Sequence, residues 1–288
     1  MEHAISFPAL GLNFNINRVA VNLFGKDIYW YGIIICLGFV LAALYVNRRT
    51  KEFGVTSDNL MDCLIICVPV GIICARIYYV AFEWGYYSQH PNEIIAIWKG
   101  GIAIYGAVIG VEIALAVYSR IKKLSFTSLC DLAAFGLLIG QCIGRWGNFF
   151  NREAFGGYTD GLLAMQLPVS AVRDSDISKE LAEHIVEIGG VSYIQVHPTF
   201  LYESLWNLGL LVILLLIRKR KKFEGEIFLL YLAGYGIGRA WIEGLRTDQL
   251  LIPGTSVAVS QVLAVVLAVV SVMMLIILRK KAVSRKQQ

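Results

Sequence analysis

The chain has 288 residues, of which 57% are hydrophobic and 16% are charged, and its formal net charge at pH 7 is +5. This composition excludes an ordinary soluble domain, in which about a quarter of the residues are charged, and it predicts an integral membrane protein. The positive charge does not indicate nucleic-acid binding, which would need a basic face with interleaved aromatic residues. Instead, sixteen of the 26 Lys and Arg residues lie in four short clusters.

Seven apolar runs are long enough to cross about 30 Å of hydrocarbon as helices of about 20 residues. Helices are expected because lipid offers no partner for an unpaired backbone group, and the alternating pattern of a membrane barrel is absent from the sequence. In chain order the runs cover residues 28–47, 60–82, 94–119, 126–144, 199–217, 226–245 and 256–278.

The four basic clusters lie at alternate ends of these runs, at residues 48–51, 120–123, 218–222 and 279–286. An excess of Lys and Arg is typical of cytoplasmic loops, so these ends are predicted to be cytoplasmic. The N-terminus then lies outside the cell and the C-terminus inside, which requires an odd number of spans. The predicted fold class is an all-α polytopic membrane protein with seven transmembrane helices.

The whole chain, 1–288, is predicted to form one membrane domain with two external parts. Residues 1–27 lack the basic start and long apolar core of a cleavable signal peptide and are expected to form an external arm. Residues 145–198 form an external α+β head segment of ordinary polar composition. It contains a predicted surface helix in "RDSDISKELAEHIVE" and a turn and strand in "GGVSYIQVHP".

All six cysteines fall within the apolar runs, where small side chains suit helix packing. Cys63 and Cys67 are one helical turn apart, but no histidine accompanies them in a metal-binding pattern. The sequence therefore predicts neither a metal site nor a cofactor.

Glycine rows in two runs each end in an arginine. Such rows allow close approach of helices in lipid, where association depends on packing and polar contacts. Arg145 follows one row and Arg239 the other, so both are expected at a similar depth toward the outer leaflet. The rows are at residues 136, 140 and 144 and at residues 234 and 238.

In the sixth run, Arg239, Glu243 and Arg246 have spacings that place them on one helical face. One glutamate between two arginines can orient both and leave positive charge for an anion. A structural ion-pair ladder is the alternative. We favour the anion site, because a ladder near lipid gains little over apolar packing once desolvation is included.

The stretch "GRWGNFFNRE" after the fourth run combines guanidinium donors, amides and a carboxylate, contributed by Arg145, Asn148, Asn151, Arg152 and Glu153. Arginine suits phosphate because its planar guanidinium donates two parallel hydrogen bonds. A phospholipid headgroup is the phosphate present at this depth. The stretch therefore predicts a protein that binds an anionic lipid headgroup at the outer face.

These motifs resemble those of the bacterial prolipoprotein diacylglyceryl transferases over nearly the whole chain. "GRWGNFFNREAFGG" is similar to the family signature, which reads glycine-arginine, an apolar residue, glycine-asparagine-phenylalanine, then asparagine, glutamate and a closing glycine. Five further blocks resemble family blocks in the expected order: "WYG" at 30–32, "ARIYYV" at 75–80, "GGIAIYGAVIG" at 100–110, "HPTFLYE" at 197–203 and "YGIGRAWIEGLR" at 235–246.

The resemblance implies a seven-helix enzyme of the bacterial inner (plasma) membrane with its active site toward the external face. Such an enzyme moves the diacylglyceryl group of phosphatidylglycerol onto the lipobox cysteine thiol of a prolipoprotein and releases glycerol phosphate. Its partners are phosphatidylglycerol, prolipoprotein signal peptides and membrane lipid, without nucleic acid. The transfer is the first step of lipoprotein maturation.

By this resemblance, Arg145 and Arg239 are expected to stabilise the negative charge that develops on the departing phosphate. Glu243 would position Arg239 or Arg246. Contacts to phosphatidylglycerol are expected from Arg145, Asn148, Asn151, Glu153, Gly156, Tyr31, Tyr235, Arg239 and Arg246.

This sequence differs from many members of the family in the residue at one position. Tyr105 stands in the block where many relatives carry a histidine that has been described as the base. Tyrosine, with an ordinary pKa near 10, is a poor base at neutral pH. Tyr105 is therefore assigned to the catalytic group as a hydrogen-bonding residue near the thiol or headgroup, with a packing aromatic as the alternative.

Other candidates keep two interpretations. Tyr31 and Tyr235 either contact the headgroup or belong to the interfacial aromatic belt. His197 is either a base near the thiol or a turn residue fixed by Pro198. Arg76 either binds lipid or serves packing.

Functions of other classes are less consistent with the sequence. A transporter or channel would use buried charges to line a pathway, but matching halves with broken helices are absent from the sequence. An intramembrane protease would need a serine motif or paired aspartates. Composition does not distinguish a non-catalytic lipid-binding scaffold from the transferase. A lipid-transfer assay distinguishes the two directly.

Overall fold

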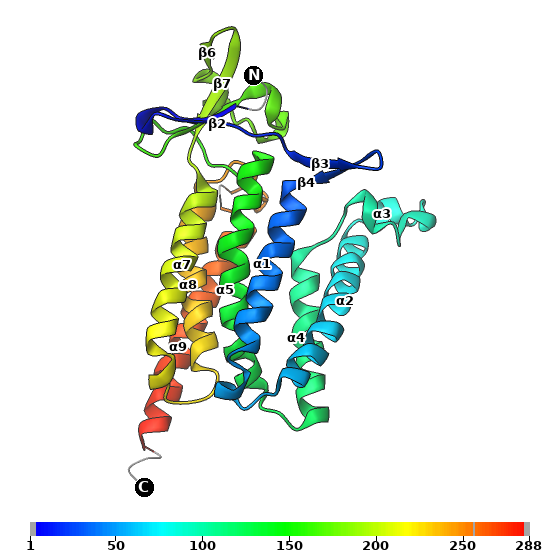
Figure 1. Cartoon of the computed structure of the whole chain (residues 1–288), viewed down its shortest axis with the longest axis vertical. Coiled ribbons are helices and arrows are strands. Elements are labelled where there is room, and N and C mark those ends of the chain that lie inside the picture. The colour runs from blue at the N-terminus through cyan, green and yellow to red at the C-terminus, as the bar shows by residue number, and fades with distance from the viewer. Residues whose placement is uncertain (1–3, 256, 285–288) are drawn as a thin grey trace. The chain divides into compact units, whose positions relative to one another are not determined.

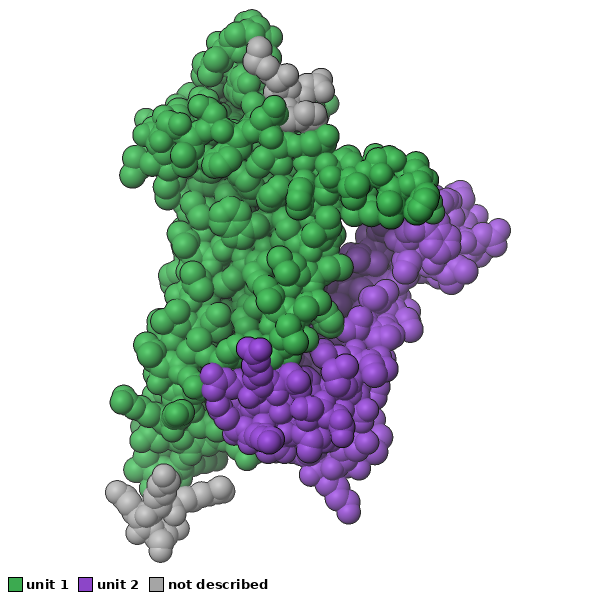
Figure 2. Space-filling view, viewed as in Figure 1, with its two compact units in different colours: residues 1–45, 134–288 green, residues 46–133 purple. Residues whose placement is uncertain are grey.

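The computed structural model describes residues 4–255 and 257–284 (Figure 1). Residues 1–3 of the predicted arm, residue 256 at the start of the last run and residues 285–286 of the last basic cluster lie outside them. The chain divides into two compact units (Figure 2). Unit 1 comprises residues 1–45 and 134–288, and unit 2 comprises residues 46–133.

Unit 1 contains long helices and two small sheets. Helices α7 and α9 both pack against α8. Gly236 of α8 lies close to the backbone of α9, because a side-chain carbon there would be 2.6 Å from the Ala264 carbonyl oxygen. The predicted glycine row of this run, Gly234 and Gly238, lies against α7 instead: a side-chain carbon at Gly234 would be 2.6 Å from the Leu210 side chain, and one at Gly238 would clash with the Trp206 ring. The helices of unit 1 are α1 (Trp30–Asn47), α5 (Phe126–Asn151), α6 (Lys179–Glu183), α7 (Thr199–Ile217), α8 (Glu226–Glu243) and α9 (Val259–Ser284). Residues 46–47 of α1 and 126–133 of α5 are counted with unit 2.

Helix α5 continues beyond the predicted apolar run, which ends at residue 144. It reaches Asn151, so the first seven residues of the expected head segment are helical. The helix ends where Arg152 and Ala154 adopt positive φ angles of 54° and 58°. This left-handed conformation is unfavourable in an α-helix for residues other than glycine. The signature stretch is thus carried partly on a helix and partly on the turn that ends it.

Unit 2 contains α2 (Ser57–Phe82) packed against α4 (Ile104–Lys122), with the short α3 (Trp84–Tyr87) between them in sequence. The third run was predicted at 94–119, and its start is wrong by ten residues. Residues 97–99 form a single 3-10 turn, and Gly100 and Gly101 follow with φ angles of 87° and 77°. Two consecutive positive φ angles prevent a helix from passing through this point.

Within the described part of the chain, six helices are long and apolar enough to span a membrane, namely α1, α2, α4, α5, α7 with its following turn, and α9. Helix α8 has the length of a span but carries Glu226, Arg239 and Glu243 within its 18 residues. Charged side chains are costly in hydrocarbon unless they are paired. The structure therefore supports a multi-pass membrane protein with six apolar helices and a seventh helix that contains charged residues.

The N-terminal arm and the head segment form one antiparallel sheet in the order β2-β1-β5-β7-β6. Ser6 of β1 pairs with Gln166 of β5, 160 positions later, and Gln166 pairs with Gln195 of β7. The buried core of this sheet includes Ile5, Leu167 and Ile194, each fully buried. Its strands are β1 (Ala4–Phe7), β2 (Leu12–Asn15), β5 (Met165–Pro168), β6 (Val186–Ile188) and β7 (Val191–Val196).

The predicted turn and strand in the head are confirmed, since Gly189 and Gly190 have positive φ angles and β7 ends before Pro198. The predicted surface helix in "RDSDISKELAEHIVE" is much shorter than that stretch, because only α6 (Lys179–Glu183) forms there. A separate hairpin of β3 (Val19–Leu23) and β4 (Lys26–Tyr29) leads into α1.

Candidate active site

Arg145 of α5 and Arg239 of α8 meet on one carboxylate. Glu203 of α7 accepts the Arg145 Nε at 2.5 Å on one oxygen and the Arg239 Nη1 at 2.8 Å on the other. Only 4% of Glu203 is exposed. Because a buried carboxylate is stable only when paired, Glu203 fixes two guanidinium groups from two different helices side by side.

The remaining charges of this network come from the end of α8 and the loop after it. Glu243 pairs with Arg239 and accepts a hydrogen bond from the Ser260 hydroxyl. Arg246 donates to both oxygens of Asp248, at 2.9 and 2.7 Å, and its Nη1 lies 4.0 Å from Glu203.

Arg246 and Asp248 form a close ion pair whose protonation is shifted by their contact. Burial by itself would raise the pKa of Asp248, but the hydrogen bonds from Arg246 lower it below its ordinary value. Burial disfavours protonated Arg246, but its bonds to Asp248 outweigh burial and raise the Arg246 pKa. Both side chains are therefore charged at neutral pH.

The network is charge-balanced, which differs from the positive excess expected from the sequence. Among the described residues, its three arginines meet three carboxylates, on Glu203, Glu243 and Asp248. The expected positive excess is wrong because two of these carboxylates, on Glu203 and Asp248, lie outside the helical face that the sequence pattern identified. The free space beside Glu203, Tyr235 and Arg239 measures about 10 Å³, enough for no more than a water molecule.

The amides of the signature stretch converge on Glu153. Asn148 and Asn151 donate to the Glu153 Oε1 at 3.0 and 3.4 Å. The side chain of Arg152 donates instead to the carbonyl oxygens of Ile16 and Phe150. Asn148 is three residues after Arg145 on the same helix, so the amides continue the face that carries the arginine.

Gly156 joins the signature stretch to the segment after α8. It forms an antiparallel bridge with Arg246, and its N–H donates to the His197 carbonyl oxygen at 3.0 Å. A side-chain carbon at Gly156 would lie 2.8 Å from the His197 Cβ and 2.9 Å from the Leu245 carbonyl oxygen. The closing glycine of the signature is therefore needed for close backbone approach.

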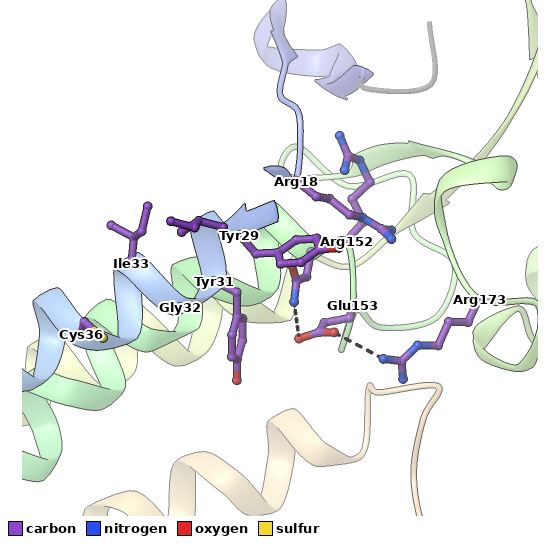
Figure 3. Close-up of a pocket in the computed structure, with 11 residues that line it drawn as sticks. Arg18, Tyr29, Tyr31, Gly32, Ile33, Cys36, Arg152, Glu153 and Arg173 are labelled. Atoms are coloured by element: carbon purple, nitrogen blue, oxygen red, sulfur yellow. Dashed lines mark hydrogen bonds and ion pairs between the residues drawn. The ribbon is translucent and has the colours of Figure 1, made fainter. Parts of the chain in front are cut away.

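A cavity of about 800 Å³ lies where α1, the end of α5 and the head meet in unit 1 (Figure 3). Three of the predicted headgroup contacts, Tyr31, Asn151 and Glu153, line it. The Tyr31 ring rests on α5 at Gly147, where a side-chain carbon would lie 2.8 Å from the ring. The structure thus brings most of the predicted headgroup contacts into two groups, one at Glu203 and one around this cavity.

Two candidates border the Glu203 network or the signature stretch. Tyr235 stacks on Tyr231 with ring centroids 5.7 Å apart and lies beside Glu203 and Arg239. The His197 ring is 3.2 Å from the Tyr202 hydroxyl, while its backbone bonds to Gly156 and Gly157. Burial lowers the pKa of His197, and its backbone contacts agree with the turn interpretation.

Tyr105 and Arg76 lie in unit 2. Arg76 donates to the carbonyl oxygens of Glu93, Ile94, Gly100 and Gly101 at 2.6 to 2.8 Å, and only 6% of it is exposed. These contacts support the packing interpretation of Arg76, which holds the loop before α4. The Tyr105 ring lies 6.5 Å from that of Tyr78, and its catalytic assignment stays a prediction.

The sequence interpretation missed three features of this region. Glu203 was not identified as the hub of the network, although a glutamate in an apolar run is itself a signal for a cationic partner. Arg18 and Arg173 also line the cavity. They come from segments without a recognisable motif, so local sequence gave no signal for them.

Known proteins resemble this chain over most of its length. The pattern of the family described as prolipoprotein diacylglyceryl transferase matches residues 18–277. A relative from Limosilactobacillus reuteri, named phosphatidylglycerol--prolipoprotein diacylglyceryl transferase, is 45% identical over 275 residues, which is 94% of each chain. Relatives of the same name from Bacillus velezensis and Lysinibacillus sphaericus are 42% and 46% identical, covering 94% and 83% of this chain and 96% and 84% of their own lengths. The chain belongs to the prolipoprotein diacylglyceryl transferase family.

Proposed function

We propose that this chain transfers the diacylglyceryl group of phosphatidylglycerol to the lipobox cysteine thiol of prolipoproteins. The names of its relatives and its family support this activity. The observation that carries the assignment to residues is the meeting of Arg145 and Arg239 on Glu203. Two guanidinium groups held at one carboxylate form a preorganised binding site for a phosphate.

The reaction is a displacement at the terminal glyceryl carbon of the lipid. The cysteine sulfur, as thiolate, forms the new carbon–sulfur bond while the carbon–oxygen bond to phosphate breaks. The bonding electrons leave with glycerol phosphate, and the product is a thioether. Arg145 and Arg239 stabilise the charge on the departing phosphate, and Glu243 orients Arg239 through their ion pair.

The substrate thiol must lose its proton, because a free cysteine with a pKa near 8.5 is mostly protonated at neutral pH. Positive charge near the thiol favours the thiolate. Tyr105 supplies a hydrogen bond to the thiol or headgroup in this proposal, and it leaves the proton to another acceptor. Tyr105→Phe is therefore expected to slow transfer, and an unchanged rate would assign Tyr105 to packing instead.

The headgroup glycerol is held next to the arginines by the amides of the signature stretch. Asn148, Asn151 and Glu153 already share hydrogen bonds, and an alcohol can join such a network as donor and acceptor. Gly156 keeps the backbone near Arg246, while Tyr31 lines the large cavity and Tyr235 lies beside Glu203 and Arg239.

The proposed topology has seven spans, with α8 as the seventh. The charges of α8 support this assignment because each is paired: Glu226 with Arg279 at 2.5 Å, and Arg239 and Glu243 within the Glu203 network. With the basic clusters on the cytoplasmic side, the head and active site face the exterior of the bacterial inner membrane.

A reconstituted transfer assay tests this function. The full chain in phosphatidylglycerol nanodiscs is mixed with a lipobox peptide, and the peptide mass is followed. We expect addition of a diacylglyceryl group to the cysteine peptide and none to the matched serine peptide. An unmodified cysteine peptide, with correctly inserted protein, would contradict the proposed function.

A further inference from the structure

The hairpin of β3 and β4 has one polar face and one apolar face. Residues directly opposite each other in an antiparallel pair lie on the same face of the sheet. Asn22 pairs with Asp27 on the polar face, where the Asn22 amide donates to the Asp27 carboxylate at 2.7 Å. The other face carries two register pairs, Val21 with Ile28 and Leu23 with Lys26. That face is therefore apolar apart from one lysine.

The apolar face of the hairpin is open. Val21 and Leu23 are both exposed, and the hairpin forms a two-stranded sheet of its own, separate from the head sheet. A two-stranded hairpin by itself is marginally stable in water. An exposed apolar face on such a hairpin is therefore explained best by a surface outside the chain that covers it.

The tip of the hairpin carries an aromatic residue in an unfavourable backbone conformation. Phe24 and Gly25 form the two-residue turn, with φ angles of 51° and 77°. Asn-Gly is the favoured sequence for a turn with two positive φ angles, which a bulky side chain adopts at a cost in free energy. Phe24 is also 96% exposed. Neither the turn nor packing among the described residues accounts for a phenylalanine here, whereas contact with an apolar surface does.

The length of α1 places this hairpin at the edge of the bilayer. The 18 residues of α1 extend about 27 Å and are a candidate span over their whole length. The hydrocarbon core is about 30 Å thick, and Arg48 and Arg49 follow the other end of α1. Trp30 must therefore lie at the hydrocarbon boundary, directly after β4. Figure 1 shows the hairpin leaving α1 across the helix axis, so its tip stays close to this boundary.

We propose that the β3–β4 hairpin is a membrane anchor whose apolar face and Phe24 ring insert into the interfacial region of the bilayer where α1 begins. In the proposed topology this is the outer leaflet. Aromatic rings are favoured at this depth, and the stem of Lys26 allows its charge to reach the lipid phosphates. Lys26 and Asp27 are the only charged residues in 19–29. Insertion therefore depends on apolar contact and does not need an anionic headgroup.

Fluorescence quenching measures the depth of the tip. The full chain with Phe24→Trp is placed in phosphatidylcholine nanodiscs with ordinary or brominated acyl chains, and the emission of the native chain in the same nanodiscs is subtracted. Ile188→Trp is the matched control, because Ile188 is exposed beside the turn of the β6–β7 hairpin, which points away from the helices (Figure 1). We expect bromine to lower the added emission of Phe24→Trp about twofold and that of Ile188→Trp by less than about 10%.

A second variant separates lipid contact from the stability of the turn. Phe24→Asn removes the ring but supplies a residue that tolerates a positive φ angle, so it makes the turn itself more favourable. Hydrogen exchange of the backbone amides of residues 21–28 is followed by mass spectrometry in phosphatidylcholine nanodiscs. Loss of the anchor should raise their exchange rates about threefold, while the amides of β6 and β7 keep theirs. Without an anchor, the better turn would lower the exchange rates of residues 21–28.

Equal quenching of the two tryptophan variants would overturn the proposal, as would slower exchange in Phe24→Asn. Quenching that appears only when phosphatidylglycerol replaces phosphatidylcholine would also overturn it, because the hairpin would then bind a headgroup. If residues 21–28 were protected only after a lipobox peptide is added, the hairpin would be a peptide-docking surface and the anchor would be wrong.

Discussion

The Glu203 network and the cavity are neighbouring arginine-rich regions with opposite properties. In the network, Arg145, Arg239 and Arg246 are neutralised by carboxylates and leave about 10 Å³ of space. The cavity has about 800 Å³ and a positive excess. A balanced, filled network is rigid and orients its arginines. The cavity is open and has room for a ligand.

This difference implies that Glu203 occupies the position of a phosphate between Arg145 and Arg239. Headgroup binding at the network must then displace part of an existing ion pair, whereas binding at the cavity displaces none of the carboxylates that hold Arg145 and Arg239. The predictions below test this division, from the largest expected effect to the smallest.

Removing either arginine of the network should have the largest effect. Arg145→Ala and Arg239→Ala are each expected to lower the transfer rate about 100- to 1,000-fold, as for the loss of one donor to a developing anion. The rate of thioether formation in nanodiscs measures this effect. A rate within threefold of that of the native protein would remove the substituted residue from the phosphate clamp.

Glu203→Gln should lower the transfer rate about 10- to 100-fold, because Arg145 and Arg239 lose the charge that holds them together. Breaking a buried ion pair also costs about 3–5 kcal/mol, so the thermal midpoint should fall. Glu203→Asp keeps the charge and should recover part of both losses. If Glu203→Gln were stable and fully active, Glu203 would not position the arginines.

Gly156→Ala should destabilise the junction between the signature stretch and the segment after α8. Its new carbon would crowd the Leu245 carbonyl oxygen at 2.9 Å, and such overpacking costs about 1–3 kcal/mol. The adjacent Gly157→Ala is a matched control, because its carbon would meet nothing closer than the Glu180 carboxylate at 3.7 Å. Thermal unfolding of the two variants checks the contrast, and equal destabilisation would contradict it.

The smallest expected effect concerns His197 and pH. Burial lowers its folded-state pKa below the ordinary value of 6.5, so the unfolded chain binds the proton more readily. The contribution of neutral His197 to the free energy of unfolding is present above pH 6.5 and is lost as the pH falls through the folded-state pKa. His197→Gln should reduce the loss of thermal stability between pH 7 and pH 5 by less than about 3 °C. If His197→Gln increased the pH dependence of thermal stability, the direction of the His197 pKa shift would be wrong.

Several features of the fold could be predicted because they depend on local patterns. Apolar runs indicated the long helices, and the glycine spacing of α8 indicated a close helix contact, which the structure shows against α7. The third run was placed too early because its hydropathy continues through Gly100 and Gly101, while their backbone angles end any helix. The pairing of Ser6 with Gln166 was not predictable, since it depends on how distant segments meet in three dimensions.

In the candidate site, too, local patterns identify some residues, while others are brought together only by the fold. Arg145, Asn148, Glu153 and Arg239 were found because a signature and a helical spacing identify them. Their partners, including Glu203 on α7 and Asp248 after α8, come from other segments. The cavity is lined in part by Arg18 and Arg173, which come together in its wall only when the arm folds onto the head.

The central claim is that Arg145 and Arg239 act together on one phosphate, and a double-mutant cycle on the transfer rate tests it most directly. The rates of Arg145→Ala, Arg239→Ala and the double variant are measured in the same nanodiscs. Residues that act as a unit lose activity non-additively, so the double variant should be no more than about tenfold slower than the slower single variant. Losses that multiply would show that the two guanidinium groups act independently and would contradict the account.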